Sequence, residues 1–291
     1  MTEILKLIPP ISVACIVFAQ GLGIAPSQVL GLFRDRPWLL LRILVAVLVL
    51  VPAATLVILL VLRPDPALAI GLAILVSCPP APLMVANAPK KGASAPFMAR
   101  LHLAFSAFAI LTVPAVLHVL SGPLGFKPEI DLGAMLWTLT RTNLLPLALG
   151  LAVRGLAPAA ADRLGPTLHK AGMIGIVLVV LLVLAKFYPT LLGMPAWSYL
   201  TIALVSVTAL AIGYFAGPED SSEKTGLAVE CGVRHPGLAT AIASATLTSA
   251  RALPLMIPCA LSFMVIATVY LSLRQKTLSK DPPGVTSGKP S

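Results

Sequence analysis

The segment LAVECGVRHPGLATAIA, residues 227–243, is an apolar run interrupted by charged side chains and helix-breaking residues. Glu230, Arg234 and His235 stand close together in it, and Pro236-Gly237 follows directly. Proline removes a backbone donor and disfavours the preceding helical turn, so the segment predicts a broken helix. Carbonyls freed by such a break must find partners if the surroundings are a bilayer.

The composition of the whole chain indicates an integral membrane protein. Of its 291 residues, 58% are hydrophobic and 11% are charged, whereas soluble domains carry about 25% charged residues. The net charge of +10 does not indicate nucleic acid, because the basic residues are scattered singly in short loops and in the tail. They are expected to set the topology and to contact anionic lipids of the bilayer.

Nine apolar segments are each about 20 residues or longer, enough to cross about 30 Å of hydrocarbon. The Lys and Arg residues of their short loops favour an N-terminus outside and a C-terminus in the cytoplasm, as in a multi-pass inner-membrane protein. We expect one transmembrane domain over 1–273, with repeats at about 1–120 and 132–273, and a disordered cytoplasmic tail over 274–291. The predicted spans are 5–24, 38–62, 67–89, 93–119, 132–155, 167–187, 197–216, 224–249 and 252–273.

A second broken segment, LAILVSCPPAPLMVANAPKKG at residues 72–92, occupies the corresponding place in the first half. The two broken spans are third and eighth in order and therefore cross in opposite directions, as inverted repeats require. The predicted fold is an all-α membrane protein in which two discontinuous helices cross. The backbone of the crossing is expected to comprise Cys78, Pro79, Pro80, Ala81, Pro82, Gly232, Val233, Pro236 and Gly237.

Four stretches resemble motifs of the bile acid:sodium symporter superfamily. They are FAQGLGIAPSQVLGLFRDRPWLLL at 18–41, LAIGLAILVSCPPAPLM at 68–84, TNLLPLALGLAVRGL at 142–156 and GLAVECGVRHPGLATAIA at 226–243. The resemblance implies a fold related to that of sodium–proton antiporters, with panel and core subdomains, here in a nine-helix form. It also implies secondary transport of organic anions rather than enzymatic activity.

The chain departs from this family where the resemblance implies ligands for two sodium ions. Glu230 is retained, but Arg234 and His235 replace the Gln and Asn of the second crossover motif. A guanidinium at ligand distance would repel a cation, and apolar side chains offer no oxygen ligand. Sodium therefore remains possible but is not favoured, and no cofactor or metal is expected. Apolar side chains occupy the other implied ligand positions, Val47, Met84, Val85, Phe97 and Leu101.

Further polar side chains are expected at the same depth of the membrane. PFMARLHLAF places Arg100 and His102 on the span after the first crossover, and LWTLTRTNLLP places Arg141 and Asn143 near the middle of the fifth span. Arg234 follows Glu230 by four residues, so one helical turn would bring the two charges together. Together with His235, these side chains form the predicted site for substrate or coupling ion.

The leading function is a secondary transporter that moves a small organic anion by alternating access, with arginines supplying positive potential. Two alternatives remain, namely a sodium-coupled symporter of organic anions and a non-transporting membrane sensor or scaffold. An enzyme is disfavoured because the spans contain no H-E-x-x-H, no G-x-S-x-G and no paired aspartates. Energy coupling is left open between a proton bound through Glu230 with His235 or His102, residual sodium and no coupling ion. The identity of the anion, the direction of transport and the oligomeric state cannot be read from the sequence.

Overall fold

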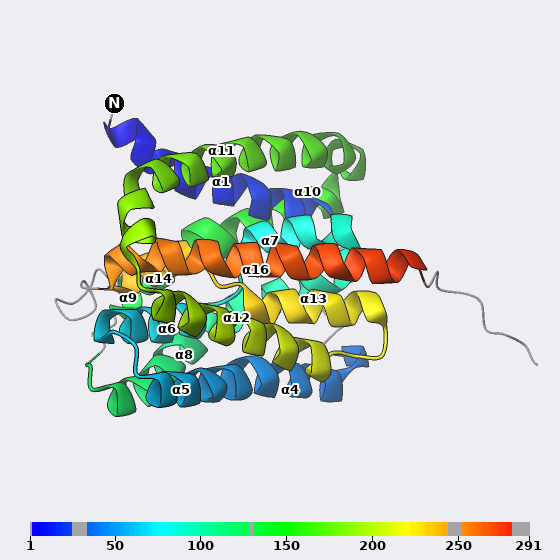
Figure 1. Ribbon diagram of the computed structural model, residues 1–291. Coiled ribbons are helices and arrows are strands. Elements are labelled where there is room, and N and C mark those ends of the chain that lie inside the picture. Colours follow the sequence, from blue (N-terminus) through cyan, green and yellow to red (C-terminus); the bar gives the residue numbers. More distant parts are fainter. Residues whose placement is uncertain (1, 25–33, 128–130, 244–251, 281–291) are drawn as a thin grey trace, which may run out of the picture.

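The computed structural model describes residues 2–24, 34–127, 131–243 and 252–280, and within these ranges the chain is almost entirely helical (Figure 1). The one β pairing of these ranges is an isolated antiparallel bridge between Pro80 and Arg234. The first half contains α1 (Thr2–Leu22), α4 (Pro37–Val45), the π-helical η1 (Ala46–Leu50), α5 (Val51–Leu62), α6 (Pro66–Ser77), α7 (Pro82–Asn87), the 3-10 segment η2 (Ala88–Lys91) and α8 (Ala95–Leu124). The second half contains α9 (Leu132–Leu139), the π-helical η3 (Thr140–Leu144), α10 (Leu145–Leu156), α11 (Pro158–Gly193), α12 (Ala196–Ala216), α13 (Ser221–Gly232), α14 (Pro236–Ala243) and α16 (Leu253–Lys280).

Four helical stretches of the described chain are long and apolar enough to cross a membrane unaided. They are Pro37–Leu62, Pro158–Leu182, Ala196–Ala216 and Leu253–Thr277. A fifth candidate is α8, whose halves meet at a bend of 70° between Ser106 and Leu111. Both predicted broken spans are interrupted, since α6 and α13 each end after 12 residues.

Prolines shape several of these helices. Pro114 lies in the second half of α8, just beyond its bend. The two π-helical turns, η1 and η3, are each followed two residues later by a proline, Pro52 and Pro146. Proline cannot donate to the ordinary i→i−4 ladder, and a π turn is one way in which a helix absorbs that loss. The chain thus stays helical through spans that proline would otherwise break.

Two boundaries differ from the sequence prediction. Helix α11 begins at Pro158, nine residues before the predicted start of its span at 167, with proline at its N-terminus, where no donor is lost. Helix α16 continues through 274–280, which the sequence assigned to a disordered tail. Arg274 donates a hydrogen bond of 2.7 Å to Ser221 Oγ, and no proline or glycine stops the helix before Pro282. Residues 281–291 of the predicted tail and 244–249 of the eighth predicted span lie outside the described residues.

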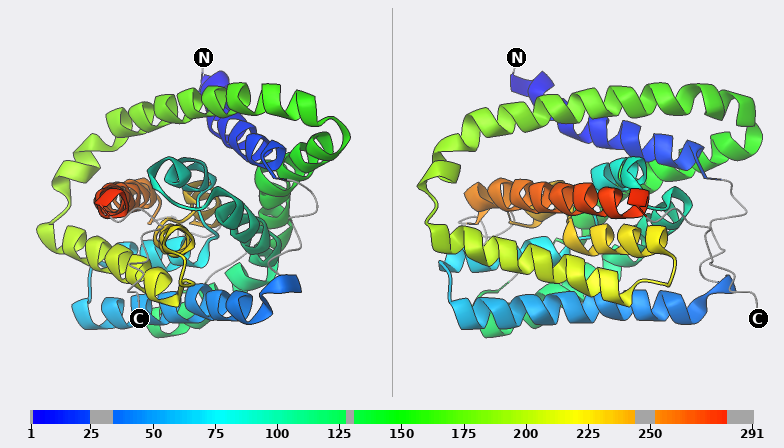
Figure 2. Two further views of the ribbon diagram at one scale, coloured as in Figure 1. Left: turned by 90° about the vertical axis from the view of Figure 1, so that its right-hand side faces the viewer. Right: turned by 45° about the vertical axis from the view of Figure 1, so that its right-hand side comes forward.

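Helices α1, α10 and α11 pack against one another and form an arc along one side of the molecule (Figure 2). We call them, with α9 and η3, the outer layer; the remaining helices form the crossing layer. Gly21 and Gly150 let α1 and α10 approach closely, because a Cβ at Gly21 would lie 2.5 Å from the Leu147 carbonyl oxygen. The helix backbones touch where larger residues would hold them apart.

The crossing layer is built around α6. Every residue from Leu68 to Ser77 is buried, so this helix is covered on all sides. Its main apolar cluster also draws on α8, through Val113 and Leu117, and on α16, through Phe263. A helix that is apolar all round belongs in the centre of a bundle, and this position fixes where its C-terminal end, the first break, must lie.

Candidate functional site

The two breaks have the same local design. After α6, Cys78 is extended (φ −73°, ψ 153°), and α7 starts with Pro82. After α13, Val233 is extended (φ −126°, ψ 124°), and α14 starts with Pro236. Each proline occupies a first-turn position where its missing N–H costs nothing. The extended residues before it leave backbone groups that need partners inside the protein.

The two breaks supply those partners to each other. The Ala81 amide donates to the Val233 carbonyl at 3.3 Å, and the His235 amide donates to the Pro79 carbonyl at 2.9 Å. These bonds flank the antiparallel bridge between Pro80 and Arg234. The predicted contact between the two interrupted helices is therefore confirmed, and residues 78–81 and 233–235 are called the helix crossing below.

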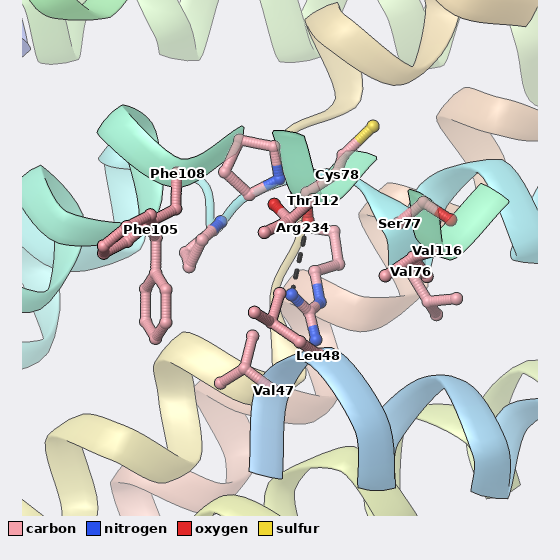
Figure 3. Close-up of a pocket in the computed structure, with 12 residues that line it drawn as sticks. Val47, Leu48, Val76, Ser77, Cys78, Phe105, Phe108, Thr112, Val116 and Arg234 are labelled. Atoms are coloured by element: carbon pink, nitrogen blue, oxygen red, sulfur yellow. Dashed lines mark hydrogen bonds between the residues drawn. The ribbon is translucent and has the colours of Figure 1, made fainter. Parts of the chain in front are cut away.

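Arg234 stabilises the crossing through its side chain as well as its backbone. The residue is 3% exposed, and its Nη1 donates to the Cys78 carbonyl at 3.3 Å. Figure 3 shows the guanidinium directed toward η1, with Val47 and Leu48 beside it. A cavity of about 10 Å³ adjoins it, room for about one water molecule. Arg234 therefore places a fixed positive charge at the centre of the bundle.

The predicted ion pair between Glu230 and Arg234 is not formed. Among the salt bridges of the described residues none joins them at 4.0 Å or less, and neither carboxylate oxygen of Glu230 has a hydrogen-bond partner there. The reason is that α13 ends at Gly232 and Val233 is extended, so the i,i+4 geometry of a helix does not reach Arg234. The two charges still attract each other at longer range.

His235 caps the second half-helix. Its Nδ1 accepts a hydrogen bond of 3.2 Å from the Leu238 amide, one of the unpaired donors at the start of α14. A neutral ring therefore carries its proton on Nε2, which lies 3.5 Å from the Asn143 side-chain amide of the outer layer. Asn143 is itself buried and donates to Thr142 Oγ1 at 3.0 Å.

His102 completes a buried polar cluster with these two residues. Asn143 and His235 lie within interaction range of its ring, but neither ring nitrogen makes a hydrogen bond of normal geometry in the part of the chain described. We call His102, Asn143 and His235 the histidine cluster. Its members come from α8, from η3 and from the second break, so the cluster joins the two layers.

Arg100 does not reach this site, contrary to the sequence prediction. Its Nε donates to the Pro96 carbonyl of its own helix at 3.0 Å, and its side chain is partly exposed. Two residues correspond to about 200° of rotation around an α-helix. Since His102 faces the crossing, Arg100 must face away from it.

A cavity of about 520 Å³ lies between the two layers at the crossing. The starts of both half-helices border it, through Pro82 on one side and Pro236 and Gly237 on the other. Arg141 of η3 carries the only permanent charge among the described lining residues, and most of the remaining lining is apolar. Both backbone donors at half-helix N-termini and an arginine favour a negatively charged ligand.

The sequence did not indicate that α1, α11 and α16 also line this cavity. They contribute Pro9, Val13, Ile176, Val180 and Met264, among others. Apolar residues within a span look alike whether they face lipid, protein or a cavity. No periodic signal separates these positions from their lipid-facing neighbours.

The positions where the resemblance implied sodium ligands are filled by apolar packing. Val47, Phe97 and Leu101 share one buried cluster, which also contains Leu227 and Cys231 of α13. Met84 belongs to another buried cluster, and the side chain of Val85 is outside what the structure describes. No group of three or more His, Cys, Asp or Glu suited to a metal ion occurs among the described residues.

Comparison with known proteins gives one clear relationship. The sequence profile of the Sodium Bile acid symporter family matches residues 10–194. This match covers the first break and the outer-layer helices, α1 from residue 10 onward, and ends before the second break. No curated protein sequence matches the chain significantly.

Proposed function

Because the chain belongs to the sodium bile acid symporter family, a family of membrane transporters rather than enzymes, we propose that it moves a small organic anion across the membrane. The transport is secondary and proceeds by alternating access. The crossing layer moves against the outer layer, and the cavity between them opens in turn to either side.

The cavity at the crossing is the observation that carries this proposal. It has a volume of about 520 Å³, within the range of about 300–1,000 Å³ typical of small-molecule sites. Arg141 and the starts of two half-helices supply the positive potential, and the apolar lining fits a ligand with a hydrophobic body. An amphipathic monoanion is the class of molecule that this combination favours.

The topology that we propose has nine spans in two inverted repeats, with the N-terminus outside and the C-terminus in the cytoplasm of an inner membrane. The antiparallel bridge between Pro80 and Arg234 supports the repeat relation, since both breaks contribute equivalent backbone bonds. The outer layer corresponds to the panel of the family fold and the crossing layer to its core.

Sodium is not favoured as the coupling ion in this proposal. The apolar cluster of Val47, Phe97 and Leu101 offers no oxygen ligand, and Arg234 already supplies a positive charge near Glu230. One observation favours the alternative of a sodium-coupled symporter, namely that both Glu230 oxygens lack a partner in the described structure. The family itself is defined by sodium symport.

Counterflow in proteoliposomes tests the proposal. Vesicles loaded with unlabelled taurocholate or unlabelled 2-oxoisovalerate, with no ion gradient, should take up the same labelled anion transiently above equilibrium. A sensor, a scaffold or an inactive protein gives only passive entry. Protein-free vesicles measure that background, and the absence of counterflow for every organic anion tried contradicts the proposal.

A further inference from the structure

His102 is a buried histidine whose presence is not explained by packing. Its side chain is 1% exposed, and neither ring nitrogen has a hydrogen-bond partner within the described ranges. An unpartnered polar group in the interior destabilises the fold, and an apolar side chain would fill the space without that penalty. Ionisable groups buried in membrane spans commonly lie on pathways for ions or protons.

Of the two imidazoles in the histidine cluster, only His102 can gain a proton without losing a hydrogen bond. His235 uses Nδ1 to accept the Leu238 amide that caps α14. Protonation of that nitrogen would break the cap at the edge of the crossing. Neither nitrogen of His102 makes such a bond in the described structure. The lone pair on its unprotonated nitrogen is therefore available to accept a proton.

The histidine cluster lies directly behind the wall of the cavity. His235 lines the cavity, as do Arg141 and Thr142 of η3, and the next residue in η3 is Asn143. Asn143 and His235 are also polar neighbours of His102. An anion held between Arg141 and the start of α14 would therefore lie beside His235, which is close enough to His102 to influence its charge.

The charges around α8 make a proton on His102 depend on that anion. The helices and turns packed most closely against α8 are α5, η1, α6, α7, α9, η3 and α13. Near the crossing, these elements carry two charged side chains, Arg141 of η3 and Glu230 of α13. The second break adds Arg234 and His235. The remaining ionisable residues of α13, Glu223 and Lys224, lie in its first turn, at the opposite end from the crossing.

His235 opposes a positive charge on His102, and the positive charges of Arg141 and Arg234 act in the same direction at longer range. Glu230 interacts with Arg234. A bound anion would offset this repulsion. The anion and the proton must then each raise the affinity for the other by the same factor.

We propose, on the basis of the transport function above, that His102 takes up a proton from water when the anion binds and that both are carried together. The proton adds to the unpaired nitrogen and gives an imidazolium, which returns the proton to water when the anion leaves. Asn143 belongs to the outer layer and His102 to the crossing layer, so movement between the layers changes the surroundings of the imidazole during each cycle.

The test compares two measurements on the same wild-type proteoliposomes, with labelled taurocholate and labelled 2-oxoisovalerate as probes. Counterflow without an ion gradient reports transport itself. Accumulation driven by an acidic exterior, with the membrane potential clamped, reports coupling to protons, and taurocholate is decisive because its sulfonate stays charged and does not cross the bilayer as a neutral acid. In the wild type we expect both, with an affinity for the anion that rises about 5- to 150-fold on acidification, the usual range for coupled sites.

The variant His102→Gln should show counterflow only with the weaker anion affinity of the unprotonated wild type, independent of pH, and should lose accumulation driven by the pH gradient, because glutamine keeps polarity but cannot bind a proton at neutral pH. His118→Gln is the matched control, since His118 is exposed on the same helix, and should behave as wild type. His102→Asn serves as a second variant if the first does not fold.

Counterflow without proton-driven accumulation in the wild type overturns the coupling alone, as does unchanged accumulation in both His102 variants. Absence of counterflow in the wild type overturns the transport function and the coupling with it.

Discussion

Pro80 and Arg234, 154 positions apart in the chain, lie opposite each other in an antiparallel backbone bridge at the centre of the bundle. The bridge ties the end of α6 to the end of α13. The Arg234 guanidinium reinforces it by donating to the Cys78 carbonyl. A substitution at Arg234 should therefore lower the stability of the crossing.

Replacement of Arg234 by leucine removes this hydrogen bond and leaves the buried Glu230 without a neighbouring positive charge. A hydrogen bond made by a charged group contributes about 1.5–3 kcal/mol, so the melting temperature in detergent should fall markedly. Arg234→Gln retains hydrogen-bond donors and should lose less. Arg100→Gln is the control, because the hydrogen bond that Arg100 makes within the described residues is to its own helix. Equal melting temperatures for Arg234→Leu and the wild type would contradict the role given to this residue.

Gly21 is predicted to resist replacement at the contact between α1 and α10. Its Cβ would lie 2.5 Å from the Leu147 carbonyl oxygen and 2.9 Å from Gly150 Cα. Since both obstacles are backbone atoms, Gly21→Ala must push the helices apart, at a cost of about 1–3 kcal/mol. Gly122→Ala in α8 provides the comparison, because no atom of the described residues lies within 4 Å of its Cβ position. Thermal unfolding should separate the two variants, and equal stability would argue against the close helix contact.

Arg141→Gln should weaken anion binding while leaving the fold intact, since Arg141 lies exposed in the wall of the cavity. A hydrogen bond to a charged group contributes about 1.5–3 kcal/mol, which corresponds to a rise of about 10- to 150-fold in the KM for taurocholate or 2-oxoisovalerate uptake. The maximal rate should change less than KM. Arg100→Gln again supplies the control, and an unchanged KM for Arg141→Gln would remove Arg141 from the site.

Replacement of sodium by potassium or choline should leave the rate of anion uptake unchanged. The positions expected to supply oxygen ligands carry Val47, Phe97 and Leu101, which pack into one apolar cluster. In Arg234→Gln, by contrast, the loss of the fixed charge beside Glu230 should allow a weak response to sodium. A steep, cooperative sodium dependence in the wild type would show that other groups complete an ion site.

Asp220 is predicted to stabilise α13 in a pH-dependent manner. Hydrogen bonds from the Ser222 hydroxyl and the Glu223 amide hold the pKa of the Asp220 carboxyl below its usual value. A lowered pKa means that the stabilisation is complete above the unfolded pKa of about 4 and is lost as the pH falls through the folded pKa. Asp220→Ala should cost about 1 kcal/mol at neutral pH, whereas Asp220→Asn should retain most of the cap. Melting curves at neutral and acidic pH test this, and an unchanged difference between wild type and Asp220→Ala at both would contradict it.

The sequence by itself determined the class of protein, the family and the two places where helices break. Apolar runs of sufficient length require a bilayer, and prolines at 79, 80, 82 and 236 prevent continuous helices there. The same chemistry led to the contact between the breaks, because backbone groups freed by proline must find partners within the protein. These are local properties of the chain, so they can be read without knowing its neighbours.

Only the tertiary structure decided which polar side chains meet. It separated Glu230 from Arg234, because the helix ends between them, and it turned Arg100 away from the crossing while His102 faces inward. It also placed Arg141 in the wall of a cavity whose remaining lining comes largely from apolar residues of distant helices. Sequence spacing gives the angle between two side chains on one helix, but the direction that each helix turns toward its neighbours is set by packing across the whole bundle.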